Sequence, residues 1–344
     1  MKAMLLNVID QMQMSEVPNP VIENDTDVLI KMARVGICGS DVHYYTSGKI
    51  GSQVVQYPFT VGHEGAGVVE SVGSAVKNVK PGDRIAIDPA ISCWECDQCK
   101  AGRHHTCRKL KFLGCPGQVE GCLSEYIIMP QECCFKIKDS MTFEQAVISE
   151  PLAIGVYSVK QSVPIRDAIV GILGAGPIGL SVLLAATAQG AEEIYVTDKI
   201  DDRVKVVKAS GADWAGNPDN INIVDEISKL ASDELDVVFE CCGQQEAIDE
   251  AMELLKPGGK LMLIGIPAVE RISFVIDKIR RKEICIQNVR RQVDCVQEAL
   301  DMIDDKKIDV DFMVTHHFGF TSTKDAFDLV ANYSDGIIKA IIDF

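Results

Sequence analysis

The sequence predicts an α/β protein with two domains, one mostly β and one built on a doubly wound parallel sheet. Short apolar runs broken by Gly and Pro fill residues 1–150, a texture typical of a β-barrel or meander. After Pro151, continuous apolar runs take turns with segments of helical length, which indicates parallel strands covered on both faces. The length of 344 residues also favours two domains.

Apolar runs between turn residues mark the strands of the first part. The expected strands lie at 28–35, 65–73 and 83–89. The segment KPGDR at 80–84 predicts a turn, because Pro and Gly stand where turns favour them.

The second part has a regular succession of elements. We expect strands at 168–173, 193–198, 235–240, 260–266 and 283–288, and helices at 177–190, 201–212 and 245–259. The first helix has Pro in its first turn and Gly at its end. The residues after the last strand are too few for a domain of typical size, so we expect them to return to the first domain and complete it. The expected division is therefore 1–150, 151–286 and a returning segment 287–344.

Composition and charge exclude several classes of function. A formal net charge of −16 argues against nucleic acid or an anionic membrane as a partner, because like charges repel. No run of 18 apolar residues indicates a membrane span, and the N-terminus does not resemble a signal peptide. The 13 cysteines then indicate a reducing cytoplasm, where clustered thiols bind metals more often than they form disulfides.

The clearest motif is a run of four cysteines at Cys93, Cys96, Cys99 and Cys107. Zinc favours four tetrahedral ligands, and two-residue gaps let a turning backbone aim successive thiolates at one point. Four sulfurs leave no open position for a substrate, so the predicted zinc is structural. The neighbouring His104 and His105 are expected to be exposed rather than metal-bound.

This spacing resembles the structural zinc lobe of the zinc-dependent medium-chain dehydrogenases, and the whole chain is similar to that family. The segment GICGSDVHYYTSGKIG at 36–51 most resembles its sorbitol (polyol) dehydrogenase branch. The resemblance implies a GroES-like, mostly-β catalytic domain and a Rossmann domain for NAD. It also implies a homotetramer.

A second metal site is indicated by Cys38, His63, Glu64 and Glu150. A catalytic zinc needs about three protein ligands and one open position. Taken alone, each residue could be a core thiol, a buried histidine or a surface carboxylate. The resemblance implies that Cys38 and His63 bind the zinc, with Glu64 or Glu150 as the acidic ligand. It leaves the ranking of the two acids open.

The residues after Cys38 suit proton transfer and substrate binding. Ser40 lies two residues from a ligand and could accept the proton of a bound alcohol, which His43 could pass to water. The alternatives are a turn hydroxyl and a surface imidazole. The resemblance implies that Tyr44 and Arg290 contact the substrate, although Tyr44 could be core and Arg290 surface. Arg291 stands where the polyol branch commonly has Tyr; this second Arg could favour an anionic substrate such as a sugar phosphate, or it could face solvent.

A glycine-rich loop between an expected strand and helix marks the cofactor site. Gly174, Gly176 and Gly179 form GxGxxG, with Pro177 and Ile178 between them. Asp198 follows the next strand, where an acid binds the ribose 2′-hydroxyl and disfavours NADP. Lys199 and Arg203 could instead bind a phosphate. The resemblance implies that Arg203 packs by the adenine ribose, and that the backbone of Ile264, Gly265 and Ile266 lies near the nicotinamide.

The sequence thus predicts an enzyme with two zinc ions per chain that moves hydride between a polyol and NAD. The alternatives are the same chemistry on threonine, a polyol phosphate or a hydrophobic secondary alcohol. A non-enzymatic protein on this fold is a further alternative, which the presence of all candidate ligands disfavours.

Overall fold

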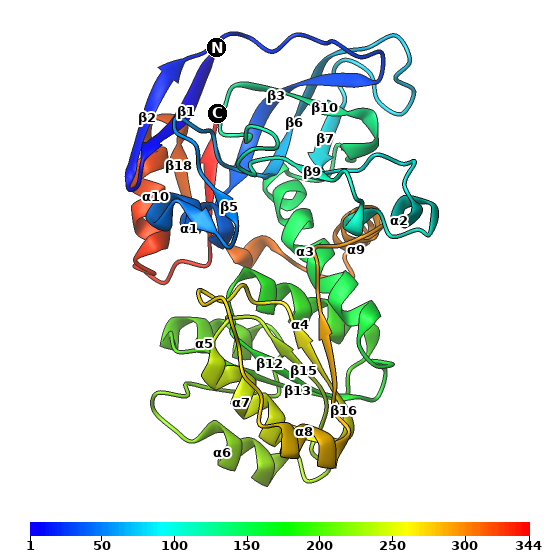
Figure 1. Ribbon diagram of the computed structural model, residues 1–344, viewed down its shortest axis with the longest axis vertical. Helices are drawn as coiled ribbons and strands as arrows, with labels where there is room; N and C mark the ends of the chain where they lie inside the picture. Colours follow the sequence, from blue (N-terminus) through cyan, green and yellow to red (C-terminus); the bar gives the residue numbers. More distant parts are fainter. The chain divides into compact units, whose positions relative to one another are not determined.

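The computed structural model describes residues 1–344 and divides into two compact units (Figure 1). The first unit comprises Met1–Glu150 and Val296–Phe344, and the second comprises Pro151–Cys295. The chain rejoins the first unit after the last strand of the second. The predicted combination of a mostly-β unit and a parallel α/β unit is confirmed.

The first unit contains a seven-stranded sheet in the order β11-β7-β6-β3-β19-β18, with β10 also paired to β3. Its strands are β3 (Asp27–Gly36), β6 (Glu64–Val72), β7 (Arg84–Ile87), β10 (Tyr126–Pro130), β11 (Cys134–Lys136), β18 (Val314–Gly319) and β19 (Lys339–Asp343). The strands predicted at 28–35, 65–73 and 83–89 correspond to β3, β6 and β7.

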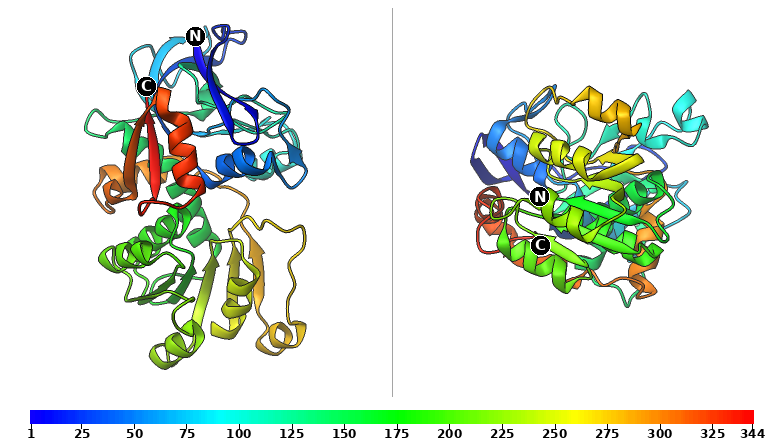
Figure 2. Two further views of the ribbon diagram at one scale, coloured as in Figure 1. Left: turned by 90° about the vertical axis from the view of Figure 1, so that its left-hand side faces the viewer. Right: turned by 90° about the horizontal axis from the view of Figure 1, so that it is seen from below.

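The end of the chain lies inside this sheet. Strand β19 pairs antiparallel with β3, with Ile341 opposite Gly36 and Ile342 opposite Val35. Helix α10 (Thr323–Ala331) packs on β19 and on α1 (Gly39–Ser47), and Figure 2 shows these C-terminal elements in red beside the blue N-terminal ones. Residues near 340 are therefore brought next to residues near 36, although the two segments are far apart in sequence.

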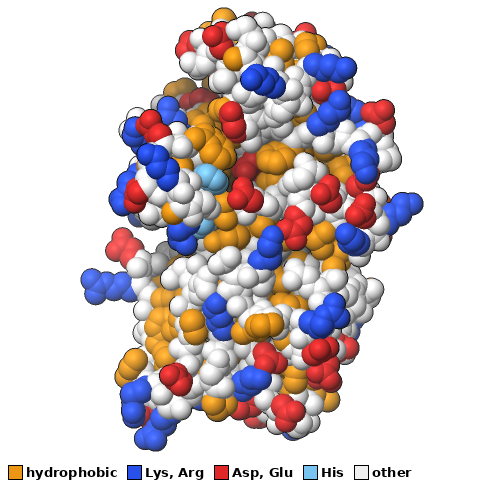
Figure 3. Space-filling view, turned by 90° about the vertical axis from the view of Figure 1, so that its right-hand side faces the viewer, with side chains coloured by type: hydrophobic (Ala, Val, Ile, Leu, Met, Phe, Trp, Pro, Cys, Tyr) orange, Lys and Arg blue, Asp and Glu red, His pale blue; other side chains and the backbone are white.

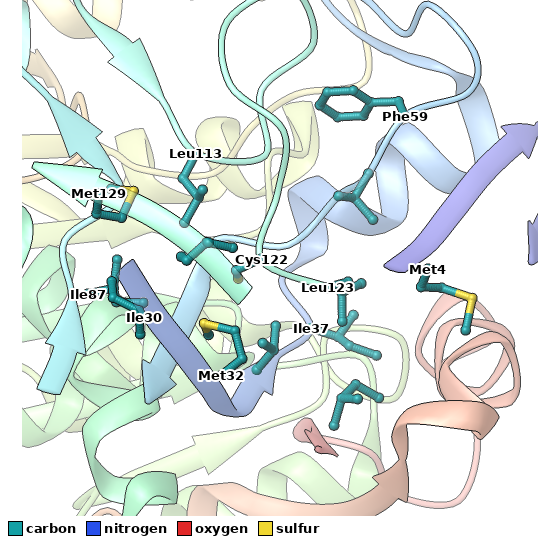
Figure 4. Packing of buried hydrophobic residues seen from close by; sticks show 14 of the residues in the cluster. Met4, Ile30, Met32, Ile37, Phe59, Ile87, Leu113, Cys122, Leu123 and Met129 are labelled. Atoms are coloured by element: carbon teal, nitrogen blue, oxygen red, sulfur yellow. The ribbon is translucent and has the colours of Figure 1, made fainter. Parts of the chain in front are cut away.

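Shorter elements and one apolar core complete the unit. They are β1 (Lys2–Val8), β2 (Gln11–Glu16), α1 (Gly39–Ser47), β4 (Lys49–Ile50), β5 (Gln53–Val54), β8 (Ala90–Ile91), α2 (Asp97–Lys100), β9 (Lys111–Phe112) and α9 (Val296–Asp304). Figure 4 shows how side chains from separate strands and loops meet in the core, among them Ile30, Met32, Leu123 and Met129. Burial of such side chains contributes roughly 1.5–3 kcal/mol each.

The second unit contains a six-stranded sheet in the order β14-β13-β12-β15-β16-β17, and every neighbouring pair is parallel. The strands are β12 (Ile169–Leu173), β13 (Glu193–Thr197), β14 (Trp214–Gly216), β15 (Leu235–Glu240), β16 (Leu255–Leu263) and β17 (Cys285–Asn288). The strand order changes direction between β12 and β15. In open parallel sheets of this kind, ligands bind at the carboxyl ends of the strands beside such a change.

Five helices connect these strands. They are α4 (Pro177–Gln189), α5 (Asp201–Ala209), α6 (Ile223–Leu230), α7 (Gln245–Leu254) and α8 (Ile276–Lys282). Helix α4 ends at Gly190 in the left-handed conformation, as its sequence predicted.

The helix predicted over 245–259 is wrong in its last turn. Helix α7 ends at Leu254, and residues from Leu255 onward belong to β16. Pro257 disfavours helical backbone at the residue before it, and Gly258 adopts a φ of +79°. Strand β16 also ends at Leu263, so the segment 264–266 follows the strand rather than forming its end.

None of the helices combines the length and the apolar character needed to cross a lipid bilayer. On the face shown in Figure 3, acidic and basic side chains are interspersed and do not form one continuous basic surface. Neither this distribution of charges nor the acidic net charge indicates a nucleic-acid interface.

Helices α3 (Phe143–Gln161) and α4 approach closely at Gly155. A Cβ at this position would lie 2.5 Å from the carbonyl carbon of Ser181. We expect Gly155→Ala to lower the free energy of unfolding by about 1–3 kcal/mol, because the helices must move apart. Chemical denaturation measures the loss. Gly319→Ala is the control, since nothing lies within 4 Å of its added carbon and, like Gly155, it has no positive φ. An equal loss in both variants would mean that the close contact with Ser181 does not cause the effect.

Candidate metal and cofactor sites

The four cysteines predicted to bind structural zinc come together in the first unit. Cys93 follows β8, Cys96 caps α2, Cys99 lies within α2, and Cys107 ends a short 3-10 turn at His104–Thr106. The Sγ–Sγ separations are 3.4 Å for Cys93–Cys107, 3.6 Å for Cys96–Cys99, 3.9 Å for Cys96–Cys107 and 4.0 Å for Cys93–Cys99. A zinc tetrahedron with Zn–S bonds of about 2.3 Å has edges of about 3.8 Å. The four sulfurs therefore fit a zinc ion.

The environment of the lobe differs between its thiols, because burial raises the pKa of Cys99 to about 12 whereas backbone hydrogen bonds favour the thiolate, the form that binds metal, at Cys96. Backbone N–H groups of Arg108 and Cys99 lower the pKa of Cys96 to about 6. The expectation that both neighbouring histidines are exposed is wrong, because His105 is buried and His104 is half-buried. His104 packs against Trp94, with ring centroids 4.2 Å apart. Neither histidine belongs to the group of potential ligands.

A second group of potential ligands consists of Cys38, His63 and Glu64. One ligand atom from each lies within 4.8 Å of the others. Cys38 immediately precedes α1, and His63 and Glu64 lie at the start of β6. Two of the three side chains are buried, and Cys38 is half-buried. A soft thiolate, an imidazole and a carboxylate suit zinc, so these residues fit the ion that the sequence predicted.

The side chain that orients His63 is Asp41, which sequence reasoning missed. Asp41 is fully buried, and its Oδ1 lies 3.2 Å from His63 Nδ1 and accepts the N–H of Gly62 at 3.0 Å. Its Oδ2 accepts the N–H of Cys38 at 3.2 Å. A carboxylate on one imidazole nitrogen directs the other nitrogen to a metal. The signal was present in the sequence as the aspartate of GICGSD.

Electrostatics at His63 reflect the same neighbours. Burial alone would lower the pKa of His63, but the carboxylate of Asp41 and the sulfur of Cys38 outweigh burial and raise the pKa well above its usual value. A positive charge is therefore favourable at this point. A metal cation would supply that charge.

Glu64 forms a buried ion pair with Lys339. Both side chains are 1 % exposed, and Lys339 Nζ donates to the two carboxylate oxygens at 2.7 and 2.6 Å. The same nitrogen donates to the carbonyl of Ile37 at 3.1 Å. Lys339 is the first residue of β19, so the pairing of β19 with β3 brings it to the site. The sequence held no local signal for this contact, because 275 residues separate the partners.

Glu150 lies in α3 and is buried, but it is outside the 4.8 Å group. Burial raises the pKa of Glu150 to about 7, with a further rise from Glu64, while His63 and Lys339 act in the opposite direction. Of the two acidic candidates, Glu64 is therefore the one that lies beside Cys38 and His63.

Helix α1 carries the residues predicted for proton transfer and substrate binding. Ser40 and His43 are half-buried, and burial lowers the pKa of His43. Tyr44 is buried, and its hydroxyl donates to Gln53 Oε1 at 3.0 Å. Gln53 was not foreseen as a neighbour of Tyr44. Arg290 is exposed and follows β17 in the second unit.

The glycine-rich loop of the second unit has the predicted context. Gly174 follows β12 with a φ of +103°, and Gly176 caps α4, whose first residue is Pro177. A Cβ on Gly179 would overlap the carbonyl oxygen of Gly174, so only glycine permits this packing. The first turn of α4, which includes Ile178, therefore presents N–H groups suited to a pyrophosphate.

Asp198 has a second role that its position in sequence did not reveal. Its Oδ2 accepts the N–H of Ala175 at 2.7 Å, and its Oδ1 accepts the N–H of Ile200 at 2.8 Å. Arg203 is buried, and its guanidinium lies 4.0 Å from Asp198 and next to Gly176. Asp198 thus fixes the glycine-rich loop, in addition to the cofactor role that the sequence predicts for it.

Comparison with known proteins places both units in described families. Residues 24–139 match the model of the alcohol dehydrogenase GroES-like domain, and residues 177–305 match that of the zinc-binding dehydrogenases. A sorbitol dehydrogenase of Bacillus subtilis is 34 % identical over 343 residues, which is 99 % of this chain and 97 % of that protein. An L-idonate 5-dehydrogenase of Vitis vinifera is 35 % identical over 90 % of this chain and 86 % of that protein.

Solved structures of dehydrogenases are similar to this chain over nearly its whole length. An oxidoreductase/dehydrogenase of unknown specificity from Escherichia coli is 32 % identical, with a TM-score of 0.93 over 99 % of this chain and 98 % of that chain. A 2R,3R-butanediol dehydrogenase from Bacillus subtilis is 26 % identical, with a TM-score of 0.90 over 100 % and 99 % of the two chains.

The cysteine lobe predicts a selective loss of metal in Cys96→Ser. We expect this variant to lose one zinc equivalent per chain and to melt at least about 5 °C lower, because a structural metal contributes several kcal/mol. Atomic absorption and thermal denaturation measure the two effects. Cys285→Ser removes an exposed thiol outside both groups and should change neither quantity. Unchanged zinc content in Cys96→Ser would exclude the lobe as a metal site.

The buried ion pair predicts a large cost for Lys339→Met. We expect the free energy of unfolding to fall by about 3–5 kcal/mol, because Glu64 would remain buried without its cation. Adding Glu64→Gln should recover part of that loss. The same substitution at Lys229, whose ion pair with Glu226 is exposed, should cost at most about 1 kcal/mol. Equal losses at Lys339 and Lys229 would mean that burial does not strengthen the pair.

Proposed function

We propose that this chain, which belongs to the family of zinc-binding alcohol dehydrogenases, oxidises a secondary hydroxyl group of a polyol to a ketone and reduces NAD. The observation that carries the proposal is the grouping of Cys38, His63 and Glu64 within 4.8 Å. It occurs in a chain that is 34 % identical, over nearly its whole length, to a protein named sorbitol dehydrogenase.

The residues of the first unit would hold a catalytic zinc ion. Cys38 and His63 supply two ligands, and Asp41 keeps the imidazole of His63 in the required orientation. We assign the acidic ligand to Glu64, on its distance, and place Glu150 beside the bound substrate or water. When bound, zinc supplies the Lewis acidity that makes an alcohol hydroxyl more acidic, and NAD supplies the hydride acceptor.

Ser40 and His43 would carry the proton of the alcohol to solvent. Ser40 is two residues from Cys38 and half-buried, so its hydroxyl suits the first transfer. Burial lowers the pKa of His43, which keeps its imidazole neutral and able to accept a proton near neutral pH. The overall reaction converts alcohol and NAD to ketone, NADH and one proton.

The cofactor would bind at the carboxyl ends of the parallel strands. The N–H groups at the start of α4 suit the pyrophosphate, and Asp198 and Arg203 suit the adenosine ribose. The carboxylate of Asp198 would repel the 2′-phosphate of NADP. For this reason NAD is the proposed cofactor.

Tyr44 and Arg290 are the proposed substrate contacts, since a phenol and a guanidinium both donate hydrogen bonds to hydroxyl oxygens. We also propose a reducing, cytoplasmic setting, which agrees with 13 cysteines that form no disulfide. A homotetramer is proposed from the family resemblance alone.

A substrate screen tests the function. Sorbitol, xylitol, a polyol phosphate, threonine and 2-butanol are each incubated with NAD or NADP, and reduced cofactor is followed by its absorbance. We expect turnover with an unphosphorylated polyol and NAD. Turnover restricted to the phosphate, to threonine or to 2-butanol would replace the proposed substrate class.

Removal of zinc by a strong chelator should abolish activity, and added zinc should restore it. Full turnover without metal would exclude the mechanism.

A further inference from the structure

Three neighbouring strands of the second unit end close together around Glu240. Strands β12, β15 and β16 lie side by side in the sheet, as Figure 1 shows, and Glu240 is the last residue of β15. Its side chain is 1 % exposed, which is unusual for a carboxylate. The proposed mechanism gives it no role.

The carboxylate of Glu240 is held by N–H groups rather than by a cation. Its Oε1 accepts hydrogen bonds from the backbone N–H of Gly243 at 2.5 Å and of Cys242 at 2.8 Å, and from the thiol of Cys242 at 3.1 Å. Partial desolvation of that thiol and repulsion by Glu240 raise the pKa of Cys242, so the sulfur stays protonated and donates. Such charge-assisted bonds hold the turn 241–243 in one conformation.

The backbone of Glu240 holds a second segment. Its carbonyl oxygen accepts the N–H of Ile264 at 2.9 Å and of Gly265 at 3.0 Å. One residue therefore fixes both the turn 241–243 and the segment 264–266, which the family resemblance places near the nicotinamide.

Close glycine contacts join these segments to each other and to the glycine-rich loop. A Cβ on Gly265 would overlap the backbone nitrogen of Gly243 and lie 2.7 Å from Glu240 Oε2. A Cβ on Gly243 would lie 2.6 Å from the carbonyl oxygen of Ile266. A Cβ on Gly174 would lie 3.1 Å from Cys242 Cβ. A shift of the turn 241–243 would therefore displace Gly174 of GxGxxG and the segment 264–266 together.

We propose that Glu240 is a positioning residue for the dinucleotide: through the turn 241–243 it sets the relative position of the glycine-rich loop and the segment 264–266. The inference rests on the proposed binding of NAD. Glu240 does not touch the cofactor. It acts by fixing the backbone N–H and carbonyl groups that do.

Glu240→Gln is the sharpest test, because the side chain keeps its shape and one oxygen but loses its charge. We expect the dissociation constant for NAD to rise about ten-fold or more, because a neutral amide oxygen accepts weaker hydrogen bonds from Cys242 and Gly243 than a carboxylate does. Calorimetric titration of the zinc-loaded enzyme measures this. Hydrogen–deuterium exchange without NAD should be faster over residues 241–243 and 264–266. The catalytic rate at saturating NAD should change by a smaller factor than the dissociation constant for NAD.

Val238→Ala is the matched control. Val238 is fully buried in the same strand, so its truncation lowers stability without touching the strand ends. We expect its NAD affinity to match that of the wild type. Equal affinity losses in the two variants, or an unchanged affinity in Glu240→Gln, would overturn this inference alone. If the wild-type enzyme itself failed to bind NAD, the proposed function would fall, and this inference with it.

Discussion

The buried ion pair between Glu64 and Lys339 connects the candidate catalytic group to the end of the chain. Both side chains are almost completely removed from water, so each needs the other as a partner of opposite charge. The pair forms only when β19 lies in register beside β3. Gly36 is required at the same point, because a Cβ there would overlap the carboxylate of Glu64. The site in the first unit is therefore assembled from both ends of the sequence.

Buried carboxylates lie at the candidate catalytic and cofactor sites, and each carboxylate is stabilised by different donors. Asp41 is held by His63 and two backbone N–H groups, Glu64 by a lysine, and Glu240 by a turn and a thiol. A buried carboxylate is costly unless its oxygens are matched by donors. Once matched, it fixes those donors in place. For Asp41 and Glu240 the donors belong to the segments that would carry zinc and the dinucleotide.

Much of the second unit could be predicted from the sequence. The apolar run before Gly174 and the Pro and Gly that bound α4 are local signals, and the structure places these elements as expected. The helix predicted over 245–259 ends early, at Leu254, for a local reason as well. Pro257 disfavours helical backbone at the residue before it, although the apolar pattern before Leu255 is helical. The burial of His105 depends on packing within the lobe, which residue type alone does not reveal.

The sequence by itself determined the sites whose residues are close along the chain. The spacing of four cysteines and of three glycines restricts the backbone enough to define a zinc lobe and a phosphate loop. The tertiary structure decided the partners that come from elsewhere, namely Lys339 for Glu64 and Ile264 and Gly265 for Glu240. Strand register sets those contacts, and it depends on packing across the whole sheet. No short stretch of sequence contains that information.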